Sequence, residues 1–285
     1  MKREPKPGWL KRKLPTGPEY EHVRALLASS GLTTVCQEAK CPNMWECFSK
    51  KTSTFMILGS ECTRNCRFCN VTPGTPGLPD PTEPERVADA AKTLGLRYVV
   101  VTSVTRDDLE DGGSAHFAAT IRAIRRGVER AKIEVLIPDF QGRNEDLETV
   151  LQARPDVLNH NIETVPSLYS TARPQAKYQQ SLDLLKRAFE IAPDIPTKSG
   201  IMVGLGETDQ QLIQTMNDLY AHGCRILTLG QYLQPSRSHL PVHRYCTPEE
   251  FDRLKTTALE MGFKNVAAAP FVRSSYRAEE LSCNC

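Results

Sequence analysis

The sequence of 285 residues lacks any long hydrophobic run. Its longest apolar stretches, such as Tyr98–Val101 and Val135–Pro138, are far shorter than the roughly 20 residues that a transmembrane helix needs. A surplus of one charge is also missing, because 36 Lys and Arg residues stand against 34 Asp and Glu residues and leave a formal net charge of +2. We therefore expect neither a membrane nor a nucleic acid as partner.

The first residues, MKREPKPGWLKRKLP, are basic but have no apolar core, so they do not resemble a secretory signal. We expect a cytoplasmic protein, in which thiols stay reduced and a disulfide framework does not form. Ten cysteines are unusual for such a protein, and six of them fall between residues 36 and 69. Clustered cysteines of this kind indicate a metal centre or catalysis in that stretch.

From residue 52 onward, strand-like and helix-like segments alternate. Six short apolar runs without polar alternation are typical of parallel strands buried on both faces. These runs are residues 52–60, 98–103, 133–140, 156–163, 197–204 and 226–233. Amphipathic segments at helical spacing separate them, so an α/β fold with a parallel sheet is predicted. The periodicity leaves a barrel and a doubly wound open sheet as alternatives, and both bind ligands at the carboxyl ends of the strands.

The first cysteine triplet follows the first predicted strand directly. Cys62, Cys66 and Cys69 form the pattern C-x3-C-x2-C. Structural zinc takes four ligands and an iron–sulfur cube normally takes four cysteines, so three thiolates leave one position open. An open iron can bind a substrate or cofactor and pass it an electron. A zinc site completed by a remote Cys or His remains the alternative.

A second triplet lies upstream of the first predicted strand. Cys36, Cys41 and Cys47 form C-x4-C-x5-C, and a second triplet so close to the first argues against coincidence. Here too a fourth ligand must come from elsewhere in the chain. The candidates by chemistry are a histidine, an oxygen donor, Cys224, Cys246, Cys283 and Cys285.

The stretches TVCQEAKCPNMWECFS and CTRNCRFCNV, with RSSYRA at residues 273–278, together resemble the lipoyl synthase family of the radical S-adenosylmethionine superfamily. The similarity runs from about Trp9 to Ala278. It implies a partial (β/α)6 TIM-like barrel over residues 52–262. It also implies an N-terminal extension, residues 1–51, and a C-terminal extension, residues 263–285, which together carry an auxiliary cluster.

The resemblance implies two [4Fe-4S] clusters and S-adenosylmethionine as cofactors. The cluster on the Cys62 triplet binds S-adenosylmethionine, whose reductive cleavage gives a radical that abstracts hydrogen. The cluster on the Cys36 triplet supplies two sulfur atoms to C6 and C8 of a protein-bound octanoyl-lysine. Its fourth ligand is placed on Ser275 of the RSSY motif, with Ser274 as the neighbouring alternative. An oxygen ligand binds cluster iron less well than a thiolate does, which suits a cluster that is dismantled.

Polar residues outside the two triplets are further candidates, and for Asn161 and Glu163 the resemblance supports a role at the cofactor. Arg273 is expected to position the octanoyl-lysyl amide or to brace the auxiliary cluster. The cofactor is expected to meet strand-end polar groups and two cations, for which ordinary strand-end hydrogen bonds and solvated charges are the alternatives. These cofactor-binding candidates are Thr102, Ser103, Asn161, Glu163, Arg173, Lys198 and Gln231.

The implied partners are octanoylated lipoyl-carrier domains, such as the E2 subunits of 2-oxoacid dehydrogenases and the H protein of glycine cleavage. A reductase such as flavodoxin or ferredoxin is implied as the electron donor. Two other functions remain open on the residues alone. One is another radical sulfur-inserting enzyme of the biotin synthase type, and the other is a zinc or iron–sulfur binding module without enzymatic activity.

Overall fold

The computed structural model describes residues 5–11, 17–50 and 53–282. Eight strands form one sheet in the order β1-β2-β5-β6-β7-β8-β9-β10, and every neighbouring pair is parallel except β1 with β2. The strands are β1 (Thr33–Thr34), β2 (Thr54–Ile57), β5 (Tyr98–Ser103), β6 (Lys132–Leu136), β7 (Val157–Asn159), β8 (Thr197–Val203), β9 (Ile226–Gln231) and β10 (Asn265–Ala269). The short strands β3 (Glu61–Cys62) and β4 (Thr72–Pro73) pair separately.

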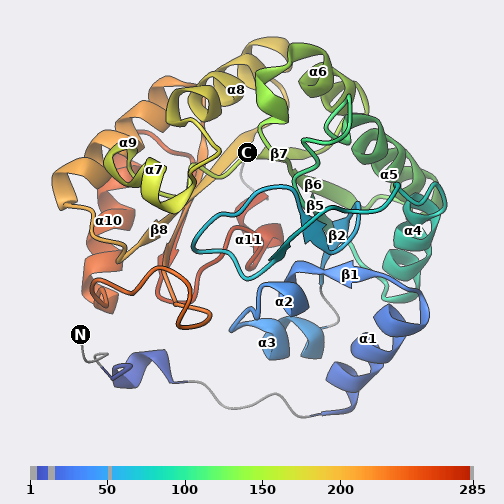
Figure 1. Ribbon diagram of the computed structural model, residues 1–285, viewed down its shortest axis with the longest axis horizontal. Coiled ribbons are helices and arrows are strands. Elements are labelled where there is room, and N and C mark those ends of the chain that lie inside the picture. Colours follow the sequence, from blue (N-terminus) through green and yellow to red (C-terminus); the bar gives the residue numbers. More distant parts are fainter. Residues whose placement is uncertain (1–4, 12–16, 51–52, 283–285) are drawn as a thin grey trace.

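Helices cover the outer face of this sheet and form an arc around it (Figure 1). The helices that follow strands β2 to β9 are α4 (Glu83–Thr93), α5 (Ser114–Gly127), α6 (Asn144–Gln152), α8 (Tyr178–Ile191), α9 (Asp209–Ala221) and α10 (Pro248–Glu260). The remaining helices are η1 (Gly8–Leu10), α1 (Pro18–Ser29), α2 (Val35–Glu38), α3 (Met44–Ser49), η2 (Phe140–Gly142), η3 (Pro166–Leu168), α7 (Tyr169–Ala172) and α11 (Ala278–Ser282).

The six predicted parallel strands are confirmed as β2 and β5 to β9, and the partial barrel is confirmed as an open one. The predicted C-terminal extension, from residue 263, contributes β10, which pairs with β9 over five residues. It adds a seventh parallel strand at one end of the sheet. At the other end lies β1, so the described part of the sheet begins in one extension and ends in the other.

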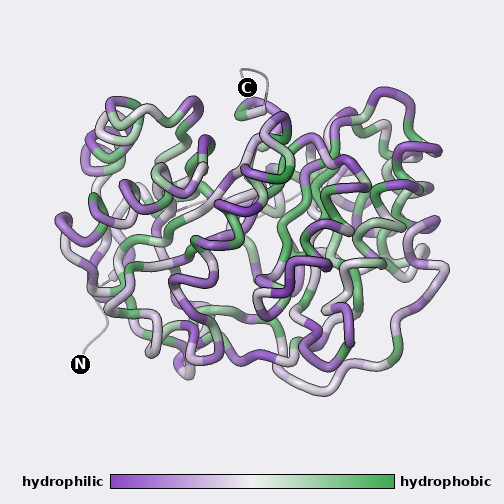
Figure 2. Tube along the Cα trace, turned by 90° about the horizontal axis from the view of Figure 1, so that it is seen from above, coloured by the Kyte–Doolittle hydropathy of each residue, from purple (hydrophilic) through white to green (hydrophobic). Residues whose placement is uncertain are grey.

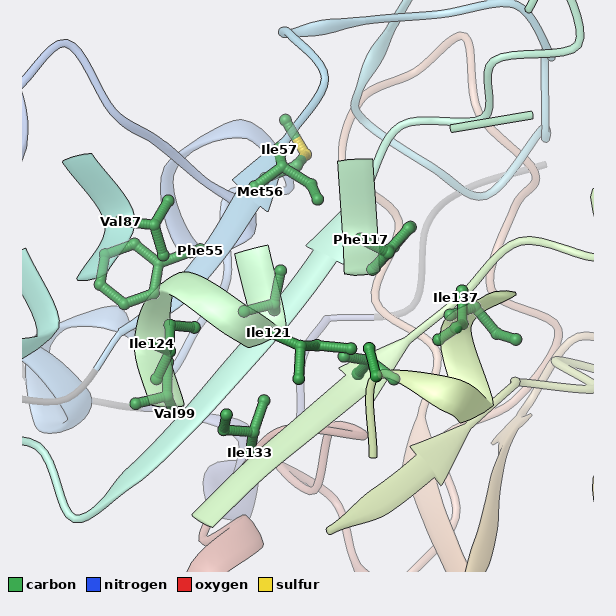
Figure 3. Close-up of a cluster of buried hydrophobic side chains, with 14 of the residues drawn as sticks. Phe55, Met56, Ile57, Val87, Val99, Phe117, Ile121, Ile124, Ile133 and Ile137 are labelled. Carbon is green, nitrogen blue, oxygen red and sulfur yellow. The ribbon is translucent and has the colours of Figure 1, made fainter. Parts of the chain in front are cut away.

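Packing between α5 and the strands beneath it shows why the fold forms. Phe117, Ile121 and Ile124 recur at helical spacing, are fully buried, and face Val99 and Ile133 of the sheet (Figure 3). Along the backbone trace in Figure 2, hydrophobic residues gather on the inner strands and hydrophilic residues on the outer turns. Burial of such side chains stabilises the fold by about 1.5–3 kcal/mol each.

The short helix α11 lies within the ring of strands and helices (Figure 1) and contacts β5. Tyr98 and Val100 of β5 point to the inner side and form a small buried cluster with Ala278 of α11. None of the helices in the described ranges is long and apolar enough to cross a membrane.

Candidate cluster and cofactor site

The loop with the first cysteine triplet begins where β2 ends. Leu58 and Gly59 both have left-handed backbone conformations, with φ of 69° and 98°, and they turn the chain out of the sheet. The Leu58 amide donates to the buried carboxylate of Glu83 at 2.9 Å. A left-handed conformation at leucine is uncommon, so this anchored turn fixes the start of the cysteine loop over the carboxyl ends of the strands.

A buried arginine inside the cysteine loop fixes its position. Arg64 donates two hydrogen bonds to Asp107, at 2.6 and 2.9 Å, and two to Asp139, both at 2.7 Å. Burial raises the pKa of Asp139, but the hydrogen bonds and charge of Arg64 outweigh this and bring it to about 2. The sequence analysis missed this ion network because its members are up to 75 residues apart.

The three thiols of this loop lie within electrostatic reach of one another. Burial, together with the nearby Cys66 and Cys62, raises the pKa of Cys69 to about 12. Burial also raises the pKa of Cys66, while the Arg173 guanidinium opposes that shift. The Cys62 sulfur accepts the backbone N–H groups of Arg64 and Thr105 at 3.4 Å. Iron binding would release these thiol protons, so the loop is chemically suited to a thiolate-held cluster.

A cavity of about 410 Å³ opens beside this loop at the carboxyl ends of the strands. We call it the strand-end cavity. Cys69, Asn161 and Glu163 line it from the barrel side. Cys36 and Ser275 line it from the two extensions. Residues of both cysteine triplets therefore line one cavity.

Unpartnered polar atoms lie close to this cavity. The Asn161 amide nitrogen donates to Glu163 at 3.1 Å, whereas its buried oxygen Oδ1 has no hydrogen-bond partner in the described part of the chain. Arg173 donates to the Asn161 carbonyl at 3.0 Å, and its buried Nε is also unpartnered there. A Cβ on Gly200 would lie 2.9 Å from the Asn161 oxygen, so only glycine leaves this space free. Buried polar atoms without partners fit a site that receives a polar ligand.

Three of the other predicted cofactor-binding residues, Thr102, Lys198 and Gln231, form hydrogen bonds or an ion pair with other residues of the chain. Lys198 forms a buried ion pair with Glu134, at 2.8 and 3.0 Å to its two oxygens. Thr102 donates to the Leu136 carbonyl. The Gln231 side chain bonds four backbone groups, although the residue lines the strand-end cavity. Of these residues, Ser103 alone has a buried hydroxyl without a partner among the described residues, and neither it nor Lys198 lines the cavity.

The second triplet lies on two short helices and the turn between them. Cys36 is buried in α2, and Cys47 is in α3. Cys41 lies in the turn between them, where its backbone N–H donates a hydrogen bond of 3.0 Å to the Cys36 carbonyl. Burial, together with the nearby Cys41 and Cys47, raises the pKa of Cys36 to about 12. All three line a second cavity of about 390 Å³ together with Ser275. We call this the auxiliary cavity.

Two hydrogen bonds join this triplet to distant parts of the chain. The Asn43 amide donates to the Phe271 carbonyl at 2.6 Å, which joins the triplet to the segment before the RSSY motif. Asn70, next to Cys69, donates to the Glu38 carbonyl at 2.7 Å. The two triplets and the C-terminal extension are therefore held together by contacts that span more than 30 residues of sequence.

The described residues hold no preformed site for a single metal ion. In the described ranges no three His, Cys, Asp or Glu side chains are grouped closely enough to hold one metal ion. Cys224 and Cys246 are buried in the second hydrophobic cluster and line neither cavity. Cys283 and Cys285 lie outside the described residues.

Comparison with known proteins agrees with this arrangement. The family model of the radical SAM superfamily matches residues 56–219, and that of the N-terminal domain of lipoyl synthase matches residues 1–41. Lipoyl synthase of Desulfotalea psychrophila is 60% identical over 97% of this chain and 92% of its own length. The enzyme of Rubrobacter xylanophilus is 55% identical over 98% of this chain and 87% of its own.

Solved structures share the fold at low sequence identity. The hydrogenase maturase HydG from Carboxydothermus hydrogenoformans superimposes with a TM-score of 0.56 at 17% identity, over 80% of this chain and 64% of its own. Streptococcus suis SuiB, solved with S-adenosylmethionine, gives 0.57 at 10% identity, over 87% and 55%. The chain belongs to the lipoyl synthase family of the radical S-adenosylmethionine superfamily, whose chemistry uses [4Fe-4S] clusters and S-adenosylmethionine.

Proposed function

We propose that the strand-end cavity is where this lipoyl synthase inserts sulfur at C6 and C8 of an octanoyl group carried on a protein lysine. One observation carries the proposal. Residues of both triplets, Cys69 on one side and Cys36 and Cys41 on the other, line the same cavity. An acyl chain in this cavity faces both centres, as a reaction that pairs hydrogen abstraction with sulfur transfer requires.

The Cys62, Cys66 and Cys69 thiolates are proposed to hold the first cluster. When bound, this cluster and S-adenosylmethionine supply the hydrogen-abstracting radical, and the auxiliary cluster supplies the sulfur. Asn161 and Glu163 are proposed to bind the polar end of the cofactor. Burial raises the pKa of Glu163 while Arg173 opposes that rise, so a cationic ammonium group would be favoured beside this carboxylate.

Further roles follow from the partners of each remaining candidate. Arg173 is proposed to orient Asn161 through its carbonyl, and the unpartnered Ser103 hydroxyl to complete the polar surface. Three residues whose groups are engaged inside the barrel are proposed to shape the cofactor site rather than to touch the cofactor. These are Thr102, Lys198 and Gln231.

The auxiliary cluster is proposed to bind Cys36, Cys41, Cys47 and Ser275. Ser275 lines both cavities, whereas Ser274 lines only the strand-end cavity, which favours Ser275 as the fourth ligand. Residues 1–51 and 263–285 act in this proposal as the extensions that carry this cluster. Arg273 also lines both cavities and is proposed to position the octanoyl-lysyl amide between them.

Family membership implies a lipoyl-carrier substrate and a reductant. We propose that the carriers are octanoylated E2 subunits of 2-oxoacid dehydrogenases and the glycine cleavage H protein. A flavodoxin or ferredoxin is proposed as the reductant, and the cytoplasm as the compartment in which they meet.

The test separates cofactor cleavage from sulfur transfer. Each of Cys62→Ala, Cys66→Ala and Cys69→Ala should abolish formation of 5′-deoxyadenosine from S-adenosylmethionine. Ser275→Ala should retain that cleavage with an octanoyl-lysyl peptide but lose the dithiolated product, both followed by mass spectrometry. Wild-type yields of lipoyl peptide from Ser275→Ala would refute its role, and iron and sulfide contents of each variant serve as the control for cluster loading.

A further inference from the structure

A carboxylate contact joins the auxiliary cysteines to the RSSY motif. The Tyr276 hydroxyl lies 2.9 and 3.0 Å from the two carboxylate oxygens of Glu46, across 230 residues of sequence. Arg277 donates to the same carboxylate at 3.2 Å. The Glu46 side chain is 14% exposed, so water competes little for these bonds. We refer to Glu46, Tyr276 and Arg277 as the clasp.

The members of the clasp are direct sequence neighbours of two proposed cluster ligands. Glu46 precedes Cys47, and Tyr276 follows Ser275. A hydrogen bond between Glu46 and Tyr276 therefore brings Ser275 close to Cys47. We propose that Glu46 is a positioning residue, which holds Ser275 over the auxiliary cysteines by binding Tyr276. This inference rests on the proposed role of Ser275 as the fourth ligand.

A positioning residue is needed because the proposed fourth ligand, Ser275, is a serine. A serine oxygen binds cluster iron less well than a thiolate does, so its bond to iron contributes little to ordering the segment around it. A phenol that donates to a charged carboxylate makes a stronger hydrogen bond than a neutral pair does. The clasp orders the segment before the iron is bound, which lowers the entropic cost of using a weak ligand.

A second tether lies at the other end of the same segment. The Asn43 amide donates to the Phe271 carbonyl at 2.6 Å. Residues 271–276 are thus held at both ends by residues of the Cys41–Cys47 stretch. Ser275 lies between the two tethers and is free to face the cavity that all three cysteines line.

The clasp lies away from the proposed cofactor site. Glu46, Tyr276 and Arg277 line the auxiliary cavity and do not line the strand-end cavity, whereas Asn161 and Glu163 line only the latter. A change in the clasp should therefore alter the auxiliary cluster and leave cleavage of S-adenosylmethionine at the first cluster intact. A merely structural role would affect both sites together.

The test uses the holoenzyme with both clusters and follows the loss of each cluster to an iron chelator by Mössbauer and absorption spectroscopy. Tyr276→Phe removes one hydroxyl and keeps the ring, so folding is preserved. It should lose auxiliary iron about 10- to 100-fold faster than wild type, as expected for one hydrogen bond to a charged group. Glu46→Ala should do the same, and the double variant should be no faster than either single one.

A matched control comes from the same carboxylate. Lys50 bonds Glu46 at 3.2 Å, but its side chain is 59% exposed and it directly follows the helix that carries Glu46, so it does not tie Glu46 to the RSSY motif. Lys50→Ala should therefore keep the wild-type rate of iron loss. Equal rates for Tyr276→Phe and Lys50→Ala would overturn the inference. So would additive effects of Tyr276→Phe and Glu46→Ala, or a parallel loss of the first cluster.

The same measurements distinguish a wrong inference about the clasp from a wrong assignment of Ser275 as a ligand. If Ser275→Ala leaves the Mössbauer spectrum of the auxiliary cluster unchanged, Ser275 is not a ligand, and both proposals fall. If Ser275→Ala changes that spectrum but Tyr276→Phe changes neither spectrum nor rate, the ligand stands and the clasp alone is refuted.

Discussion

Replacing Arg64 by alanine should damage the first cluster site through its buried ion network. The Arg64 and Asp139 side chains are 5% and 0% exposed, and four hydrogen bonds join Arg64 to Asp139 and Asp107. Removing one partner of a buried ion pair leaves an uncompensated charge and costs about 3–5 kcal/mol. The Asp107 side chain is 29% exposed, so water can solvate its carboxylate in the variant. The expected loss of unfolding free energy is therefore near the lower end of that range.

The assay is urea unfolding of the wild type and the variant at pH 7, under anaerobic conditions and at matched iron content. Arg64→Ala/Asp139→Asn should recover part of the lost stability, because the buried charge is removed as well. Formation of 5′-deoxyadenosine should fall in Arg64→Ala, since Arg64 lies between Cys62 and Cys66 in the loop. A loss of stability below about 1 kcal/mol would refute the reasoning, because that is the size expected of an exposed pair.

The same network predicts a pH dependence with a definite sign. The pKa of Asp139 is lowered from 3.8 to about 2 in the folded protein, so its contribution to stability is present above the unfolded value. That contribution, about 2 kcal/mol, is lost as the pH falls from about 4 to about 2. Iron-free wild-type protein should show this loss in urea unfolding, and iron-free Arg64→Ala should show none of it.

Three further outcomes are expected. Lys198→Met should lower the unfolding free energy by about 3–5 kcal/mol, because Glu134 is left charged at 1% exposure, and Lys198→Met/Glu134→Gln should recover much of it. Gly200→Ala should raise the KM for S-adenosylmethionine with little change in melting temperature, because its Cβ would press on Asn161. Chelation of all iron should lower the melting temperature measured by calorimetry, and a temperature unaffected by iron would contradict the fit of the cysteines to clusters.

The parallel strands could be predicted because each is a short, continuous apolar run. β5 and β9 are buried along nearly their whole length, which produces the pattern of a strand covered on both faces. β10 was missed since its sequence, NVAAA, is rich in alanine, a weak strand former. Its place in the sheet comes from pairing with β9, which local sequence does not encode.

The two cysteine triplets could be recognised from their spacing, whereas the residues that position them could not. Cysteines at C-x3-C-x2-C are recognisable within eight residues of sequence. Asp139 and Glu46 have no such local signature, because their partners Arg64 and Tyr276 are 75 and 230 residues away. The ion pair of Lys198 could not be predicted either, because a lysine on a strand does not show which level of the barrel it occupies. Glu134, from another strand, is the partner that places it.

The open sheet and the Cys36 triplet are separate parts of the structure. The strands from β2 to β10 form a continuous hydrogen-bonded wall around the proposed cofactor site, whereas the Cys36 triplet and Ser275 lie outside that wall on short helices and turns. A cluster held there by side-chain contacts between the two extensions can lose sulfur and iron without breaking any strand pairing. If the auxiliary cluster binds there as proposed, the strand pairing around the proposed cofactor site outlasts the cluster consumed in each reaction, and the same barrel can be reloaded.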